Sequence, residues 1–131
     1  MKMILHVFFL TSLFLVSCNK DDEMKKDIPE RSATVTDVIL PESAKAGESF
    51  ELTIKYEVSG CETLKMVNTS MNDSSATYHL IIHNPSANDP SVNCPMGFFE
   101  ENYIESLAFN QIGVKRIYFN DSSLVKTIEI Q

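Results

Sequence analysis

The feature that most constrains the fold is the segment Ser49 to Val58, "SFELTIKYEV", in which apolar and polar residues alternate strictly. Its apolar side chains fall at every second position from Phe50 onward, with Glu, Thr and Lys between them. Successive side chains of a β-strand point to opposite faces of the sheet, so this pattern gives one dry face and one wet face. The segment therefore predicts a β-strand that is buried on one side.

Six more segments have the composition of strands, and turn residues separate many of them at roughly the 8 to 12 residue spacing of a β-sandwich. They are 33–40, 63–67, 76–82, 103–109, 114–119 and 124–130, of which 63–67 is the weakest. Pro41 ends the first of them, which we expect to be an edge or first strand. No stretch combines helical periodicity with caps. We therefore predict an all-β fold, a single antiparallel β-sandwich of about seven strands, in residues 32–131.

The size and charge of residues 32–131 restrict what this domain can do. One hundred residues suffice for one domain with a modest core but not for two. Six Lys or Arg residues stand against thirteen Asp or Glu residues, and only Lys115 and Arg116 are adjacent cations. Because phosphate binding needs clustered cations, we expect no nucleic-acid partner.

The first seventeen residues have the pattern of a secretory signal peptide. Lys2 supplies a positive start, and a nearly unbroken apolar run follows from residue 3 to residue 16. A membrane span needs about 20 apolar residues, whereas a signal peptide has a run of about 7 to 15 and a small residue before the cut, here Ser17. We therefore predict that residues 1–17 direct export of the chain.

The residue after this signal is Cys18, and "LVSC" resembles the lipobox of bacterial lipoproteins. In that family the thiol of the first mature residue forms a thioether with a diacylglyceryl group, and a further acyl chain such as palmitate is usually added at the freed amine. Two or more acyl chains anchor a protein far more firmly than one. The resemblance implies lipidation at Cys18, and the alternative is a plain secreted protein with a chance cysteine.

The segment "NKDDE" after the cysteine is similar to the lysine-plus-acids signal that sends some lipoproteins of Gram-negative bacteria to the cell surface. The resemblance implies export to the outer face of the outer membrane, and the residues that carry it are Lys20, Asp21, Asp22 and Glu23. A periplasm-facing anchor is the alternative, because a tether can be acidic for solubility alone. Residues 18–31 have too few bulky apolar side chains to offset chain entropy, so we predict a flexible tether there.

Setting Cys18 aside leaves Cys61 and Cys94, an even pair in a chain expected to enter an oxidising compartment. We therefore predict a disulfide between them. A catalytic thiol is the competing interpretation, but it would need a base and a low-pKa environment, and neither cysteine has a neighbour that suggests one.

A resemblance to a known family spans most of the mature chain. "AGESFELTIKYEVSGC", a second cysteine downstream and the closing "GVKRIYF…IEI" resemble the small immunoglobulin-like domains of Gram-negative surface lipoproteins. The resemblance implies an immunoglobulin-like β-sandwich, in a family where many members have no assigned activity. The sequence departs from antibody domains, because it has no Trp and its cysteines are closely spaced. An antibody-type core is therefore not expected.

A search for catalytic, metal or cofactor motifs gives no strong candidate. His79 and His83 are four residues apart, but on a strand that separation spans about 13 Å, too far for one ion. The four glycines are isolated from one another, so no phosphate-binding loop is expected. We expect no enzymatic activity, no metal and no cofactor.

The one candidate binding element is "CPMGFFEENY", residues 94–103. Met96, Phe98 and Phe99 stand close to Cys94, so a disulfide there would make a rigid apolar loop. The preferred interpretation is that the two phenylalanines cap the end of the sandwich as ordinary core.

We expect a monomeric, lipid-anchored binding or accessory module with a protein or glycan partner in the cell envelope. A protease inhibitor presented on the cell surface is one alternative, and it would need a rigid exposed loop, for which 94–103 is the candidate. A glycan-binding accessory subunit is another, but such proteins usually need exposed aromatic platforms, and the absence of Trp weakens it.

Overall fold

The computed structural model describes residues 27–120 and 124–131, and their regular structure consists of β-strands alone. Within these two ranges, no helix has the length and apolar character needed to cross a membrane. The strands are β1 (Glu30–Ser32), β2 (Thr34–Ile39), β3 (Ser43–Ala44), β4 (Phe50–Ser59), β5 (Thr63–Met71), β6 (Ser75–His83), β7 (Phe98–Leu107), β8 (Gly113–Phe119) and β9 (Leu124–Ile130). The predicted all-β class is confirmed.

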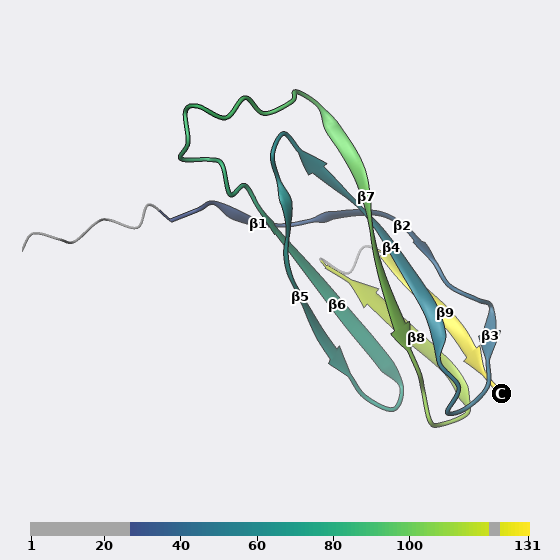
Figure 1. Cartoon of the computed structure of the whole chain (residues 1–131). Helices are drawn as coiled ribbons and strands as arrows, with labels where there is room; N and C mark the ends of the chain where they lie inside the picture. The colour runs from purple at the N-terminus through teal and green to yellow at the C-terminus, as the bar shows by residue number, and fades with distance from the viewer. Residues whose placement is uncertain (1–26, 121–123) are drawn as a thin grey trace, which may run out of the picture.

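The strands form two sheets that lie over one another as a sandwich (Figure 1). One sheet has the order β2-β4-β7. In the other sheet, β6, β8, β9 and β3 follow one another in that order; β1 pairs with the same edge of β6 as β8 does, and β5 pairs with the other edge of β6. Most pairs are antiparallel, but β3 pairs with β9 and β6 with β8 in parallel. The arrangement is consistent with the predicted immunoglobulin-like sandwich, although the second sheet is mixed and the described strands number nine rather than about seven.

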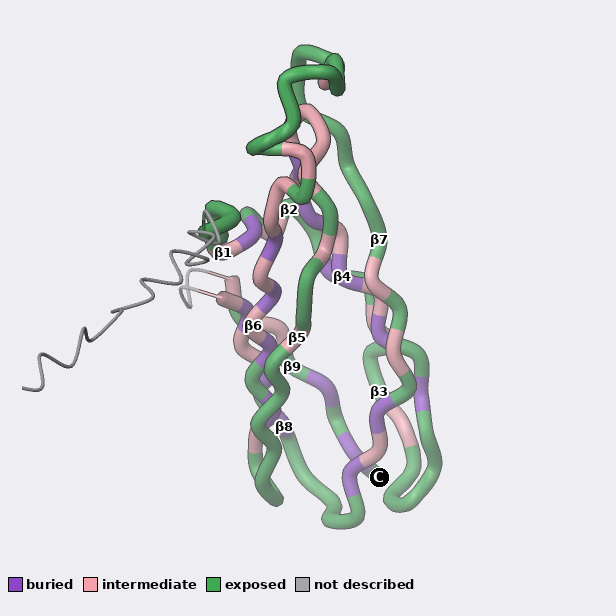
Figure 2. The backbone as a smooth tube through the Cα atoms, turned by 60° about the vertical axis from the view of Figure 1, so that its left-hand side comes forward, coloured by how far each residue is buried: buried purple, intermediate pink, exposed green. Residues whose placement is uncertain are grey.

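The alternation in β4 produces the dry face that the sequence predicts. Leu52, Ile54 and Tyr56 are between 0% and 2% exposed, whereas the residues between them are half-buried. They belong to one core cluster with the inward side chains of the other sheet, where the rings of Tyr78 and Phe119 stack with centroids 5.9 Å apart. Buried positions accordingly recur along strands of both sheets (Figure 2).

Asn120 joins two parts of the sheet in a way that the sequence did not reveal. One edge of β6 pairs with β8 at residues 75–78 and with β1 at residues 81–83. Between these two ladders, the Asn120 side chain accepts a hydrogen bond from Leu80 N at 2.7 Å and donates one to the Ala33 carbonyl. This side chain thus satisfies backbone groups at the point where β6 changes partners.

Several boundaries differ from the predicted ones, and two of these differences change how the N-terminal segment and β7 are placed. Glu30 and Arg31, assigned to the tether, belong to β1 and pair with β6. β7 begins at Phe98 rather than at residue 103, because β4 continues to Ser59 and offers an unbroken line of partners. Pairing with that partner outweighs the weak strand propensity of the acidic and amide residues 100–102.

One end of the sandwich gathers the end of β4, the start of β5, the end of β6 and the start of β7. The register places Ser59 opposite Phe98, and it places both Thr63 and Glu30 opposite His83. The N-terminal segment therefore joins the domain here, so we call this the entry end. The C-terminus lies at the opposite end (Figure 1).

Candidate functional site

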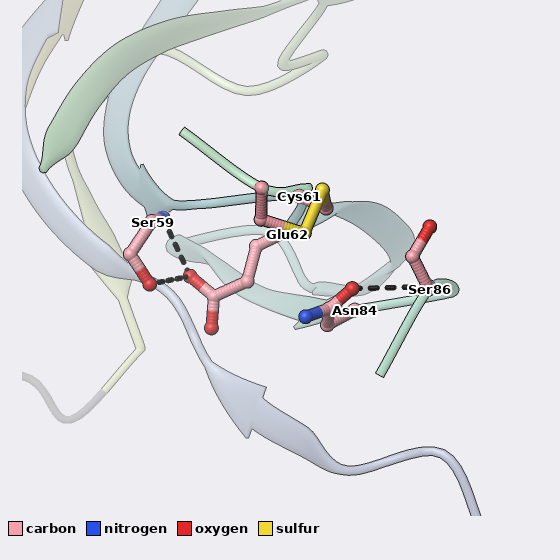
Figure 3. The surroundings of a disulfide bond; sticks show 6 residues. Ser59, Cys61, Glu62, Asn84 and Ser86 are labelled. Atoms are coloured by element: carbon pink, nitrogen blue, oxygen red, sulfur yellow. Dashed lines mark hydrogen bonds between the residues drawn. A yellow bond between two sulfur atoms is a disulfide. The ribbon is translucent and has the colours of Figure 1, made fainter. Parts of the chain in front are cut away.

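A disulfide between Cys61 and Cys94 confirms the predicted pair, with Cα atoms 5.2 Å apart. It joins the turn after β4 to the long connection between β6 and β7, at the entry end (Figure 3). Gly60 suits the turn before Cys61, because its φ is +59°. A left-handed backbone of this kind favours glycine. The disulfide therefore fixes the connection 84–97 close to its C-terminal end.

Glu62, next to Cys61, ties the first strand to the same turn. Its carboxylate accepts hydrogen bonds from the Ser59 backbone N at 2.7 Å and the Ser59 hydroxyl at 2.8 Å (Figure 3). It also accepts two from the Arg31 guanidinium, at 2.8 and 2.7 Å, a bidentate pair of the strong kind. These bonds, those from Arg31 above all, lower the pKa of Glu62 from 4.5 to about 2.

This lowered pKa predicts a specific loss of stability in acid. The folded-state pKa of Glu62 lies below its unfolded value, so its contribution is complete above about pH 4.5 and is lost as the pH falls toward 2. Denaturant unfolding at pH 7, 4 and 3 should show a smaller acid loss in Glu62→Gln than in the unmodified chain. Glu48→Gln is the matched control, because Glu48 and its partner Lys45 are 66% and 76% exposed. An unchanged pH dependence in Glu62→Gln would contradict the assignment.

Met96, Phe98 and Phe99 form an exposed apolar segment beside the disulfide. Their exposed fractions are 97%, 73% and 45%. Phe98 and Phe99 are the first two residues of β7, so they point to opposite faces of the sheet, and they pair with Ser59 and Val58 respectively. The segment is therefore held by the disulfide on one side and by a strand ladder on the other.

The preferred interpretation of Phe98 and Phe99 as core residues is wrong. Val58 of β4 is 3% exposed, yet Phe99 directly opposite it remains 45% exposed, because β7 is an edge strand whereas β4 is the central strand of its sheet. The alternative of an apolar loop over 94–103 also needs correction. Only 94–97 is loop, and the two phenylalanines lie on a strand.

Three carboxylates on β7 accept hydrogen bonds from hydroxyl groups, in pairs that were not singled out from the sequence. The Tyr56 hydroxyl donates to Glu101 at 3.0 Å, and the Tyr103 hydroxyl donates to Glu105 at 3.1 Å. Burial, and then the hydrogen bond to Glu101, raise the pKa of Tyr56 to about 12. The third, Glu100, accepts from the Thr36 hydroxyl at 2.9 Å. The register of β4 and β7 places Tyr56 directly opposite Glu101. The contact of Thr36 with Glu100 depends on the order of the strands β2, β4 and β7.

The remaining chemistry of the described residues is sparse. Residues 27–120 and 124–131 contain no group of three or more His, Cys, Asp or Glu side chains placed to hold a metal ion. His79 lies on β6 with its Nε2 2.8 Å from the Ser32 hydroxyl. The best-formed hollows hold about 140 to 250 Å³, which is less than the roughly 300–1,000 Å³ of a typical small-molecule site. The entry end is therefore the better candidate for function.

The residues of the predicted anchor lie outside the part of the chain that the structure describes. These are Cys18 and the acidic signal, Lys20, Asp21, Asp22 and Glu23. Comparisons with protein-family models, with curated proteins and with solved structures found no match for this chain.

Proposed function

We propose that this chain is a lipid-anchored module of the bacterial cell envelope that binds a protein or glycan partner through its entry end. The observation that carries the proposal is the exposure of Met96 and Phe98, at 97% and 73%, on backbone that a disulfide and a strand hold in place. Burying such side chains against a partner is worth about 1.5 to 3 kcal/mol each. Because the disulfide and the strand already restrain the backbone here, less backbone entropy is lost on binding.

The anchor part of the proposal is supported by "LVSC" at the end of an apolar run and by the acidic segment after Cys18. We place the chain at the outer membrane, facing outward, as a monomer. Replacing Cys18 with Ala should abolish incorporation of a labelled fatty acid and leave the precursor unprocessed. Labelling that persists in this variant would contradict the anchor.

The binding part predicts a loss of partner without a loss of fold. Met96→Ala and Phe98→Ala should each lower affinity by about 30-fold if they are central contacts worth about 2 kcal/mol. The free energy of unfolding should change by no more than about 0.5 kcal/mol, because both side chains are largely exposed. The measurement is partner recovery from detergent-solubilised envelopes, together with the melting temperature.

Ile112 and Val114 provide matched controls for this experiment. They are 73% and 66% exposed and lie near the start of β8, at the opposite end of the sandwich. Ile112→Ala and Val114→Ala should leave recovery unchanged. Equal losses from both ends would mean that recovery reflects general apolar adhesion, and the proposed site would be rejected.

A surface-presented protease inhibitor is the second candidate, and the loop 94–97 favours it. Met96 is 97% exposed and lies two residues from the disulfide-bonded Cys94, so it has the accessibility and restraint that an inhibitory loop needs. The full chain should then inhibit a protease with affinity that Met96→Ala weakens. Unchanged inhibition in that variant, or none with the unmodified chain, would leave the first candidate.

A further inference from the structure

We propose that the free edge of β7 binds an extended, basic segment of a partner protein by adding it as a fourth strand to the sheet β2-β4-β7. The inference rests on the proposed binding function and specifies its partner. Strand addition of this kind gains affinity from main-chain hydrogen bonds and specificity from alternate side chains.

One backbone edge of β7 is open in the described structure. Among the described residues β7 pairs with β4 alone, and it does so from Phe98 to Leu107. The N–H and C=O groups of successive strand residues point to opposite edges, so about half of those in β7 face away from β4. These groups can pair with an added strand.

The other long edge strands of the described structure, β2 and β5, have interruptions that β7 lacks. The pairing of β2 with β4 is interrupted between Val35 and Asp37, and the pairing of β5 with β6 is interrupted between Leu64 and Met66. Bulges of this kind, lysines and prolines are common protections against edge pairing. β7 has an unbroken register and contains neither Lys nor Pro. It is thus the longest regular edge that remains available for pairing.

The negative charge of β4 and β7 favours a basic occupant. Five carboxylates lie on β4 and β7 together, against one cation, Lys55; the carboxylates are Glu51, Glu57, Glu100, Glu101 and Glu105. Glu57 lies directly opposite Glu100, and like charges in that position destabilise a sheet. Lys55 Nζ is 3.7 Å from Glu100, but it also lies 3.9 Å from Asp37. A strand that brings lysine or arginine beside Glu100 would offset this repulsion.

The same charges disfavour a second copy of this chain as the occupant. A second β7 would bring another three carboxylates and no cation to the shared edge. A basic segment with apolar residues at alternate positions fits better, because its basic residues would share the outward face with Glu100 and its apolar residues would lie on the opposite face beside Phe99, which is 45% exposed. The occupant is therefore an extended basic peptide segment of another protein.

Hydrogen exchange on the full chain, purified in detergent, tests the proposal. The probe is a ten-residue peptide of alternating valine and lysine, added to about ten times its dissociation constant. Exchange of the outward amides of residues 98–107 should slow by about tenfold, whereas residues 63–71 of β5 should not change. The same peptide with glutamate in place of lysine, and a version methylated at every backbone nitrogen, should give no protection.

Other outcomes overturn the proposal. Equal protection by the methylated peptide would mean charge attraction without strand pairing. If β7 is protected without the peptide and this protection rises with protein concentration, a second copy of the chain is the occupant. If β7 is protected without the peptide and this protection disappears when residues 19–26 are deleted, the chain's own segment is the occupant. The proposed function has a separate readout, which is partner recovery. If Phe98→Ala lowers partner recovery but the peptide gives no protection of β7, strand addition is rejected and the proposed function stands.

Discussion

Truncation of Phe109 to alanine is expected to lower the free energy of unfolding by about 3 to 5 kcal/mol, the usual cost for a buried phenylalanine. Phe109 is 1% exposed, and its ring stacks on Phe50 with centroids 6.4 Å apart. Lys115, itself only 4% exposed, places its Nζ 5.8 Å from the centre of the Phe109 ring. Removing the ring therefore leaves a cavity and takes a favourable contact from a buried cation.

Denaturant unfolding of the full chain measures this effect, and Phe98→Ala is the matched control. The two substitutions delete the same atoms, but Phe98 is 73% exposed and should lose no more than about 0.5 kcal/mol. For a domain of this size the Phe109 variant should melt more than about 10 °C below the unmodified chain. Similar losses at both positions would contradict the division into core and exposed surface.

Reduction of the disulfide between Cys61 and Cys94 should cost about 3 to 4 kcal/mol. The bond closes a loop with a sequence separation of 33 residues, and the chain-entropy model gives that range for a loop of this length. The loss is a large share of the roughly 5 to 15 kcal/mol that a domain has in total. Unfolding curves with and without reductant measure it.

The double replacement of Cys61 and Cys94 by Ser is the control for side effects of the reductant. It should reproduce the loss seen on reduction and become insensitive to reductant. If reduction leaves the unfolding curve unchanged, the turn after β4 and the connection 84–97 hold one another without the bond, and the rigidity assigned to the exposed apolar segment has another source.

The alternation of apolar and polar residues predicted best those strands whose two faces differ most in burial. In β4 the alternation alone identified both the strand and its buried residues, because one face packs on the core and the other faces water. β5 was predicted only for 63–67, although it continues to Met71. Its second half, Asn68 to Ser70, is polar and exposed, and it is a strand only because β6 pairs with it. Such pairing leaves no periodic signal in the sequence.

The candidate site was predictable in part for the same reason. Once Cys18 was set aside, the remaining pair in a chain expected to enter an oxidising compartment was enough to predict the bond between Cys61 and Cys94. The exposure of Phe98 depends on β7 being an edge strand, and strand order is set by contacts between segments far apart in the chain. The roles of Glu62 and Asn120 likewise depend on partners 31 and 87 residues away, Arg31 and Ala33.

Photo-cross-linking in intact cells tests the proposed binding site at the entry end most directly. A photoreactive residue placed at position 98 of the full chain should give a discrete covalent adduct with an envelope partner. The same residue at position 112, at the opposite end of the sandwich, should give none, although Ile112 and Phe98 are both 73% exposed. An adduct from position 112 alone, or from neither position, would contradict a binding site at the entry end.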